Sequence, residues 1–138
     1  MTSYIFYALL SALFAALVAI FGKLGLENVD STLATTIRAG VMFFFLLSFS
    51  LATGKLNLNL NTRFWVFIML SGVAGALSWL FYFMALKNGN VSTVVAIDRL
   101  SIVFALLFAW FIFKEEVTIR TLIGALLIVV GAIMVSMK

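Results

Sequence analysis

Long apolar runs separated by short polar breaks extend along nearly the whole chain. Residues 41–47 (Val-Met-Phe-Phe-Phe-Leu-Leu) are apolar on every side, whereas a strand of a membrane barrel would alternate apolar and polar residues. A helix satisfies its own backbone hydrogen bonds, as the interior of a bilayer demands, and needs about 20 residues to cross it. The pattern therefore predicts an all-α membrane protein with five transmembrane helices joined by short loops. We expect these helices at residues 4–22, 32–53, 64–86, 91–113 and 121–137.

The composition supports a chain that is embedded in lipid. Of the 138 residues, 65% are hydrophobic and 10% are charged, whereas soluble domains are roughly half apolar and one quarter charged. We expect a single transmembrane domain over residues 1–138. The net charge of +4 in so apolar a chain favours the lipid bilayer as its partner and argues against nucleic acid.

Catalytic and metal-binding patterns are missing from the sequence. The chain has no His and no Cys, so neither zinc nor thiol chemistry is expected. It also lacks a glycine-rich phosphate loop and any serine with a histidine base. We therefore predict that the protein is not an enzyme and uses no metal or cofactor.

The loop charges do not decide the orientation of the chain in the membrane. Five crossings place the N-terminus, the second loop and the fourth loop on one side. That side has the four loop cations Lys55, Arg63, Lys114 and Arg120. The other side has Lys23, Lys87 and Lys138, with Arg38 and Arg99 close to it. So small a difference leaves two interpretations open: a fixed topology set by other features, or dual topology with antiparallel pairing of two copies.

Three charged residues, Arg38, Asp98 and Arg99, lie inside the predicted helices, about 10 Å along them from the same side of the membrane. Lys23 ends the first helix on that side. An ionised side chain in lipid costs about 3 kcal/mol, so it usually faces protein or water. Either the two arginines only extend to the interface, or the charges line a net-positive polar cavity. In that cavity Asp98 would pair with Arg38, Arg99 or Lys23 and would be the expected proton-coupling group, being the only carboxylate inside a helix.

Two acidic residues and several small residues are further candidates. Glu115 and Glu116 follow the fourth helix, where they are either loop charges or a gate at the far end of a pathway. On the third helix Ser71, Gly75, Ser78 and Tyr82 share one stripe, and small residues let membrane helices approach closely. We expect helix packing, within the chain or between copies, at Ser71, Gly72, Gly75, Ser78, Gly124 and Gly131.

Several short motifs in a fixed order point to one family. They are Phe21-Gly22-Lys23-Leu24-Gly25-Leu26, Ile37-Arg38, Ala85-Leu86-Lys87-Asn88-Gly89, Ala96-Ile97-Asp98-Arg99-Leu100-Ser101, and Glu115-Glu116 followed by Gly124 and Gly131. Over essentially its full length the chain resembles the half-size bacterial and archaeal EamA-type proteins of the drug/metabolite transporter superfamily. One departure is Ala96, where the family often has Pro, so a proline-broken fourth helix is not expected.

The resemblance implies a secondary transporter that moves a small solute by alternating access in the cytoplasmic membrane of a prokaryote. Full-length relatives have ten helices in two inverted repeats, with substrate near the shared interface. A five-helix half would rebuild that arrangement as a homodimer, and antiparallel pairing of the two copies is one way to form it. The expected substrate-path or coupling residues are Lys23, Arg38, Tyr82, Asp98, Arg99 and Ser101. A non-transporting membrane scaffold or partner subunit, a passive channel, and a lipid-headgroup flippase remain as alternatives.

Overall fold

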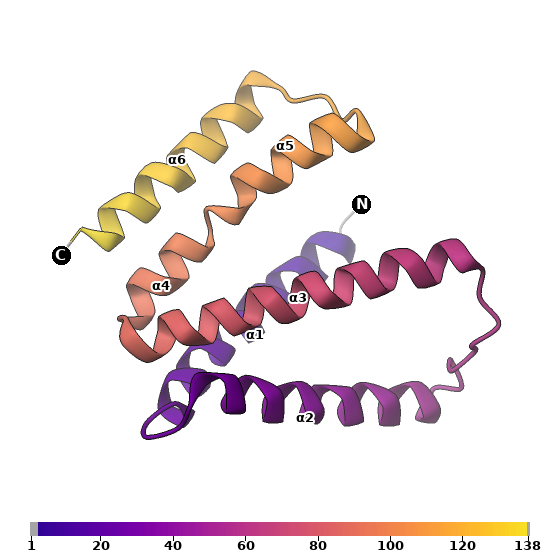
Figure 1. The fold of residues 1–138 in the computed structure, drawn as a ribbon. Coiled ribbons are helices and arrows are strands. Elements are labelled where there is room, and N and C mark those ends of the chain that lie inside the picture. The colour runs from indigo at the N-terminus through magenta and orange to yellow at the C-terminus, as the bar shows by residue number, and fades with distance from the viewer. Residues whose placement is uncertain (1–2, 138) are drawn as a thin grey trace. The chain divides into compact units, whose positions relative to one another are not determined.

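Five helical segments long and apolar enough to span a membrane make up the computed structural model, which describes residues 3–137 (Figure 1). The elements are α1 (Ser3–Gly25), α2 (Ser31–Ala52), α3 (Thr62–Asn88), α4 (Val91–Asp98), α5 (Ser101–Phe113) and α6 (Ile119–Ser136). No strand occurs among residues 3–137. The prediction of an all-α chain with five membrane-spanning helices is confirmed, and the helix ends differ from the expected ones by at most three residues.

The fourth hydrophobic segment is interrupted after Asp98, although the chain has no proline there. Arg99 keeps right-handed helical backbone angles, but its N–H is shared between the carbonyls of Val95 and Ala96 at 3.3 and 3.2 Å. The N–H of Leu100 then donates to Ile97 at 2.9 Å, a three-residue spacing. The break between α4 and α5 is therefore a tightened turn of 3₁₀ type, which keeps the backbone hydrogen-bonded without a proline.

The described residues divide into two compact units. One comprises Phe21–Lys87 and so contains the end of α1, all of α2 and nearly all of α3. The other comprises the residues up to Ile20 and those from Asn88 onward, and in it α4 packs against α6. The prediction of a single transmembrane domain stays a prediction.

A short turn joins α1 to α2 at one end of the unit Phe21–Lys87. Asn28 adopts a positive φ of 62° in this turn, a conformation that Asn tolerates better than most residues. The Asp30 carboxylate then caps α2 by accepting the N–H groups of Thr32 and Leu33 at 2.9 and 3.1 Å. These hydrogen bonds lower the pKa of Asp30, and the one from Leu33 contributes most. The positive charge of Lys87 lowers this pKa by a smaller amount.

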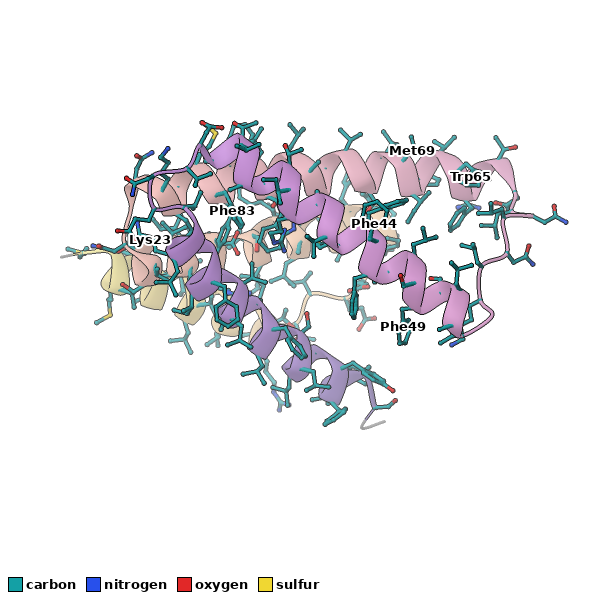
Figure 2. All side chains as sticks on the ribbon, turned by 90° about the horizontal axis from the view of Figure 1, so that it is seen from below. Lys23, Phe44, Phe49, Trp65, Met69 and Phe83 are labelled. Atoms are coloured by element: carbon teal, nitrogen blue, oxygen red, sulfur yellow. The ribbon has the colours of Figure 1, made fainter. Side chains whose placement is uncertain are left out.

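The buried core of this unit lies at the end where α1 and α3 finish. Leu26, Phe83 and Leu86 are almost fully buried there, with 3%, 3% and 0% of their surface exposed. Figure 2 shows Lys23 and Phe83 toward this end of the unit, and Phe49 and Trp65 toward the other. Side chains farther along α2 and α3 are largely exposed in the chain by itself, as expected where lipid or a second protein covers them.

Candidate substrate site

A groove of about 640 Å³ lies between α2 and α3, within the unit Phe21–Lys87. From α2 it is lined by Thr32, Thr35, Thr36, Arg38, Ala39 and Met42. From α3 it is lined by Gly72, Val73, Gly75, Ala76, Leu77, Trp79 and Leu80. Its volume lies within the usual range for a small-molecule site, and its lining is mostly apolar with a few polar groups.

Helical spacing brings these residues to facing sides of the two helices. Thr32, Thr35 and Thr36 follow the spacing of three and four residues that aligns side chains on one face of a helix. Gly72 and Gly75 follow a similar spacing on α3. An added Cβ atom would meet nothing within 4 Å at either glycine, so the missing side chains leave open space.

Arg38 is the only charged residue among those that line the groove, and it is held against an aromatic ring. Its guanidinium carbon lies 3.7 Å from the centroid of the Trp79 ring and 5.6 Å from that of Phe83. The Trp79 ring is braced in turn by edge contacts with Tyr82 and Phe83, at centroid distances of 5.4 and 6.1 Å. A cation over an indole face is stabilised by about 0.5–2 kcal/mol, so Trp79 favours this placement of Arg38.

The N–H groups of Arg38 form no hydrogen bond within the unit Phe21–Lys87. The acidic residues of this unit are Glu27 and Asp30, and neither forms an ion pair with Arg38. The hydroxyls of Thr35 and Thr36 donate to carbonyls of their own helix, at 2.7 and 2.8 Å, and neither forms a hydrogen bond with Arg38. Arg38 therefore brings an uncompensated positive charge about 10 Å along α2 from its start.

Lys23 differs from Arg38 because backbone carbonyls bind its ammonium. Its Nζ donates to the carbonyls of Leu86 and Lys87, at 2.6 and 3.2 Å, and so caps the C-terminal end of α3. The Nζ of Lys87 donates to the Val29 carbonyl at 2.8 Å, which ties α3 to the turn before α2. Positive charge at a helix C-terminus is favourable, so both lysines stabilise this end of the unit.

Asp98, Arg99 and Ser101 lie at the interruption between α4 and α5, outside the unit that holds Arg38. All three are exposed in the chain by itself. The structure thus collects them at one backbone break in the fourth hydrophobic segment. The expected pairing of Asp98 with Arg38, Arg99 or Lys23 stays a prediction.

Glu115 and Glu116 follow the end of α5 in an exposed loop. Lys114 ends α5 with a left-handed backbone at φ 56°, and its N–H bonds to the Ala109 carbonyl. The N–H of Glu115 also donates to the Ala109 carbonyl, at 3.3 Å. These backbone hydrogen bonds fix the end of α5 just before the two carboxylates, and the role of Glu115 and Glu116 as a gate stays a prediction.

The small residues expected to pack helices lie largely open. Ser71 and Ser78 are exposed and do not line the groove, whereas Gly72 and Gly75 do. At Gly124 and Gly131, as at Gly72 and Gly75, an added Cβ would meet nothing within 4 Å inside the glycine's own unit. If these positions pack helices closely, the partner is not a neighbouring helix of the same unit.

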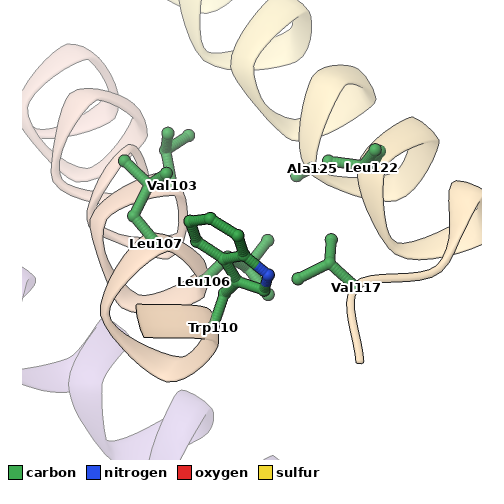
Figure 3. Close-up of a pocket in the computed structure, with 7 residues that line it drawn as sticks. All are labelled: Val103, Leu106, Leu107, Trp110, Val117, Leu122 and Ala125. Carbon is green, nitrogen blue, oxygen red and sulfur yellow. The ribbon is translucent and has the colours of Figure 1, made fainter. Parts of the chain in front are cut away.

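A second groove, of about 280 Å³, lies between α5 and α6 and is lined by aliphatic side chains and one tryptophan (Figure 3). It is lined by Val103, Leu106, Leu107, Trp110, Val117, Leu122 and Ala125. It has no charged side chain, and its one polar side-chain group is the Trp110 indole N–H, so it is less suited to a selective site than the groove of Arg38. Among residues 3–137 no group of three or more acidic, His or Cys side chains is placed to hold a metal ion.

Sequence reasoning missed two features of this region. Gly22 is a close-contact position: a Cβ there would lie 3.1 Å from the Phe83 ring. The sequence signal that could have indicated this contact is the position of Gly22 directly before Lys23, within the motif of residues 21–26. The stacking of Arg38 on Trp79 joins residues 41 positions apart, and no local pattern indicates such a pair.

Five apolar helices, with a half-buried arginine in a groove between two of them, define a multi-pass helical membrane protein. A model of the EamA-like transporter family matches residues 2–137, and the chain belongs to this family. It is similar to a protein of Sinorhizobium sp. named "Uncharacterized transporter in cobO 3'region", with 38% identity over 136 residues, or 97% of this chain and 96% of that protein. No solved structure matches the chain significantly. The protein is thus a transporter of the drug/metabolite type.

Proposed function

We propose that the protein moves a small solute across the cytoplasmic membrane of a prokaryote by alternating access, as a homodimer. The observation that carries the proposal is the groove between α2 and α3, where Arg38 brings a charge into an apolar span of a transporter-family chain. A charge at that depth costs about 3 kcal/mol in lipid, so its placement calls for a function or a partner.

Pairing of two copies would supply what one five-helix chain lacks. Inverted-repeat transporters place substrate at the interface of two related halves, and one chain of this size supplies one half. The open glycines on α6, Gly124 and Gly131, are suited to close approach by a helix of a second copy. The nearly balanced loop charges favour an antiparallel arrangement of the two copies.

In this proposal each candidate residue has a separate role. Arg38 of α2 lines the substrate path beside Trp79 of α3, and Tyr82 borders the path through its contact with the Trp79 ring. Lys23 positions the end of α3 that carries Trp79 and Tyr82. Asp98 couples transport to proton movement at the turn between α4 and α5, next to Arg99 and Ser101. Glu115 and Glu116 gate the opposite end.

Flux measurements on reconstituted vesicles test these roles. We expect both Asp98→Asn and Arg38→Ala to reduce saturable, gradient-driven solute flux at least tenfold, since each removes a charge placed within a span. Arg120→Ala, which removes an exposed arginine from the first turn of α6, is the matched control and should retain flux. Unchanged flux in both test variants would contradict the site assignment.

The pairing mode has its own test. The chain contains no cysteine, so single cysteines introduced at Thr53 and Asn88 can be labelled without background in intact cells. Thr53 directly follows α2 and Asn88 is the last residue of α3, so they adjoin loops that would face opposite sides of a chain with five crossings. Partial labelling of both from outside is expected for copies inserted in both directions. Labelling of only one position would contradict antiparallel pairing.

A further inference from the structure

We infer that the groove between α2 and α3 binds a small organic anion, with its acid group on the Arg38 guanidinium and its apolar body along Gly72, Gly75 and Ala76. This inference rests on the proposed transport function, because it names the substrate class of the same site. The shared chemistry is a carboxylate, sulfonate or phosphate group attached to an apolar body.

The charge distribution of the groove selects an anion. Arg38 is the single charged side chain in its lining, and an arginine stays protonated even in an apolar environment. Neither carboxylate of the same unit forms an ion pair with Arg38. Asp30 accepts two backbone N–H groups at the start of α2, and Glu27 is exposed in the preceding turn. A bound anion would therefore neutralise a charge that its own unit leaves unpaired.

The geometry leaves the hydrogen-bonding edge of Arg38 available. Trp79 covers one face of the guanidinium at 3.7 Å, and stacking does not occupy the N–H groups, which lie in the plane of the guanidinium. Within the unit Phe21–Lys87 those N–H groups form no hydrogen bond, so they are available for the paired hydrogen bonds that arginine makes with acid groups. The Trp79 ring thus holds Arg38 in place before a ligand arrives.

The rest of the groove matches a compact apolar body. The open space at Gly72 and Gly75 continues along a wall of apolar side chains, including Val73 and Leu77. A volume of about 640 Å³ holds a small molecule and leaves room for water near Arg38. A purely polar anion such as free phosphate would leave this apolar wall unused.

Trp79 supplies a direct binding signal. The full-length chain with Trp65→Phe and Trp110→Phe retains Trp79 as its only tryptophan, and its emission is recorded in nanodiscs of phosphatidylcholine. The probes are butanesulfonate, which is permanently ionised, and its neutral isostere butanesulfonamide. We expect a saturable change in Trp79 emission with butanesulfonate and at least about tenfold weaker binding of the sulfonamide, because the charge-assisted hydrogen bonds are lost.

Two variants connect the signal to Arg38. Arg38→Gln should weaken butanesulfonate binding at least about tenfold, whereas Lys55→Gln, which removes a cation from an exposed loop, should leave it unchanged. Circular dichroism of Arg38→Gln checks that its helix content is retained. Equal binding of the two probes, or equal butanesulfonate binding by Arg38→Gln, would overturn the inference. Binding that appears only in Asp98→Asn would also overturn it, because Asp98 would then be the anion that Arg38 holds.

Two further measurements complete the test. The first distinguishes a lipid headgroup from a free solute as the bound anion, and the second tests the inference separately from the proposed transport function. Loss of the butanesulfonate signal when phosphatidylglycerol is added to the nanodiscs supports the same chemistry with a lipid headgroup as the ligand, and an unchanged signal supports a free solute. Butanesulfonate that binds but shows no saturable flux in proteoliposomes leaves the inference standing and contradicts transport. Saturable flux of butylammonium without butanesulfonate binding contradicts the inference and leaves transport standing.

Discussion

At its C-terminal end α3 packs closely against the end of α1, whereas its middle turns face an open groove. Gly22 approaches the buried Phe83 ring so closely that a Cβ would lie 3.1 Å from it, but the same atom at Gly75 would meet nothing within 4 Å. Both positions are glycines in apolar helices, although Gly22 directly precedes Lys23 and Gly75 lies between two alanines. Their difference teaches that one glycine serves packing inside the chain and the other leaves room for something outside it.

Lys23 and Arg38 show the same difference between the packed end of α3 and the groove. Lys23 donates to two carbonyls at the end of α3, so its charge is compensated by backbone that would otherwise lack partners. Arg38 stacks on the Trp79 ring and lies near that of Phe83, and its N–H groups form no hydrogen bond within its unit. The first arrangement stabilises the fold, and we propose that the second provides a charge for binding.

The largest expected effect comes from filling the tight contact. Gly22→Leu should lower the free energy of unfolding by about 3 kcal/mol, since its side chain would overlap a ring that has no room to move. Phe83 is only 3% exposed. Gly75→Leu is the matched control. It should change stability by less than about 1 kcal/mol, because leucine favours helix more than glycine does and the space is open. Thermal or denaturant unfolding in detergent measures both, and equal losses would contradict the contrast.

The next effect separates the two cations. Lys23→Met should lower the free energy of unfolding by about 1.5 kcal/mol, because the carbonyls of Leu86 and Lys87 lose a charged donor. Arg38→Met, the same change in the groove, should cost less, about 0.5–1 kcal/mol, which is the lower part of the range for a cation–π contact because Arg38 is not fully buried. It should nevertheless abolish butanesulfonate binding. A greater stability loss for Arg38→Met would show that Arg38 is a structural residue.

The smallest effect is the pH dependence of the α2 cap. The pKa of Asp30 is lowered in the fold by hydrogen bonds from Leu33 and Thr32, so the unfolded chain binds its proton more readily. The stabilisation by Asp30 should be complete above the unfolded pKa of about 3.9 and should be lost as the pH falls through the lower folded value. Asp30→Ala should remove this acid transition from a series of melting temperatures, and Glu27→Gln, in the same turn, should retain it. Coincident curves for the wild type and Asp30→Ala would contradict this role.

Sequence reasoning located the helices well because membrane helices are marked by local composition. The expected start of the fourth segment at residue 91 and its end at residue 113 agree with Val91 and Phe113. The break after Asp98 was not expected, since the reasoning looked for a proline. A three-residue hydrogen-bond spacing breaks the regular helix without one.

The candidate site was predicted only in part. Arg38 stood out because a charge in an apolar helix is costly, and the structure places it in a groove. The stripe of Ser71, Gly75 and Ser78 was expected to share one surface, yet the groove takes Gly72 and Gly75 and leaves both serines outside. Spacing along one helix defines a face, but the neighbouring helix decides which face encloses space.

The sequence by itself determined that the chain is helical, crosses the membrane five times and has charges where lipid disfavours them. The physical reason is local: backbone groups in a bilayer must be hydrogen-bonded within the same segment, so each long apolar run must be a helix. Only the tertiary structure decided which cation meets carbonyls and which meets an aromatic ring. That outcome depends on how helix ends approach one another across more than 40 residues of sequence, as for Lys23 with Leu86 and Arg38 with Trp79.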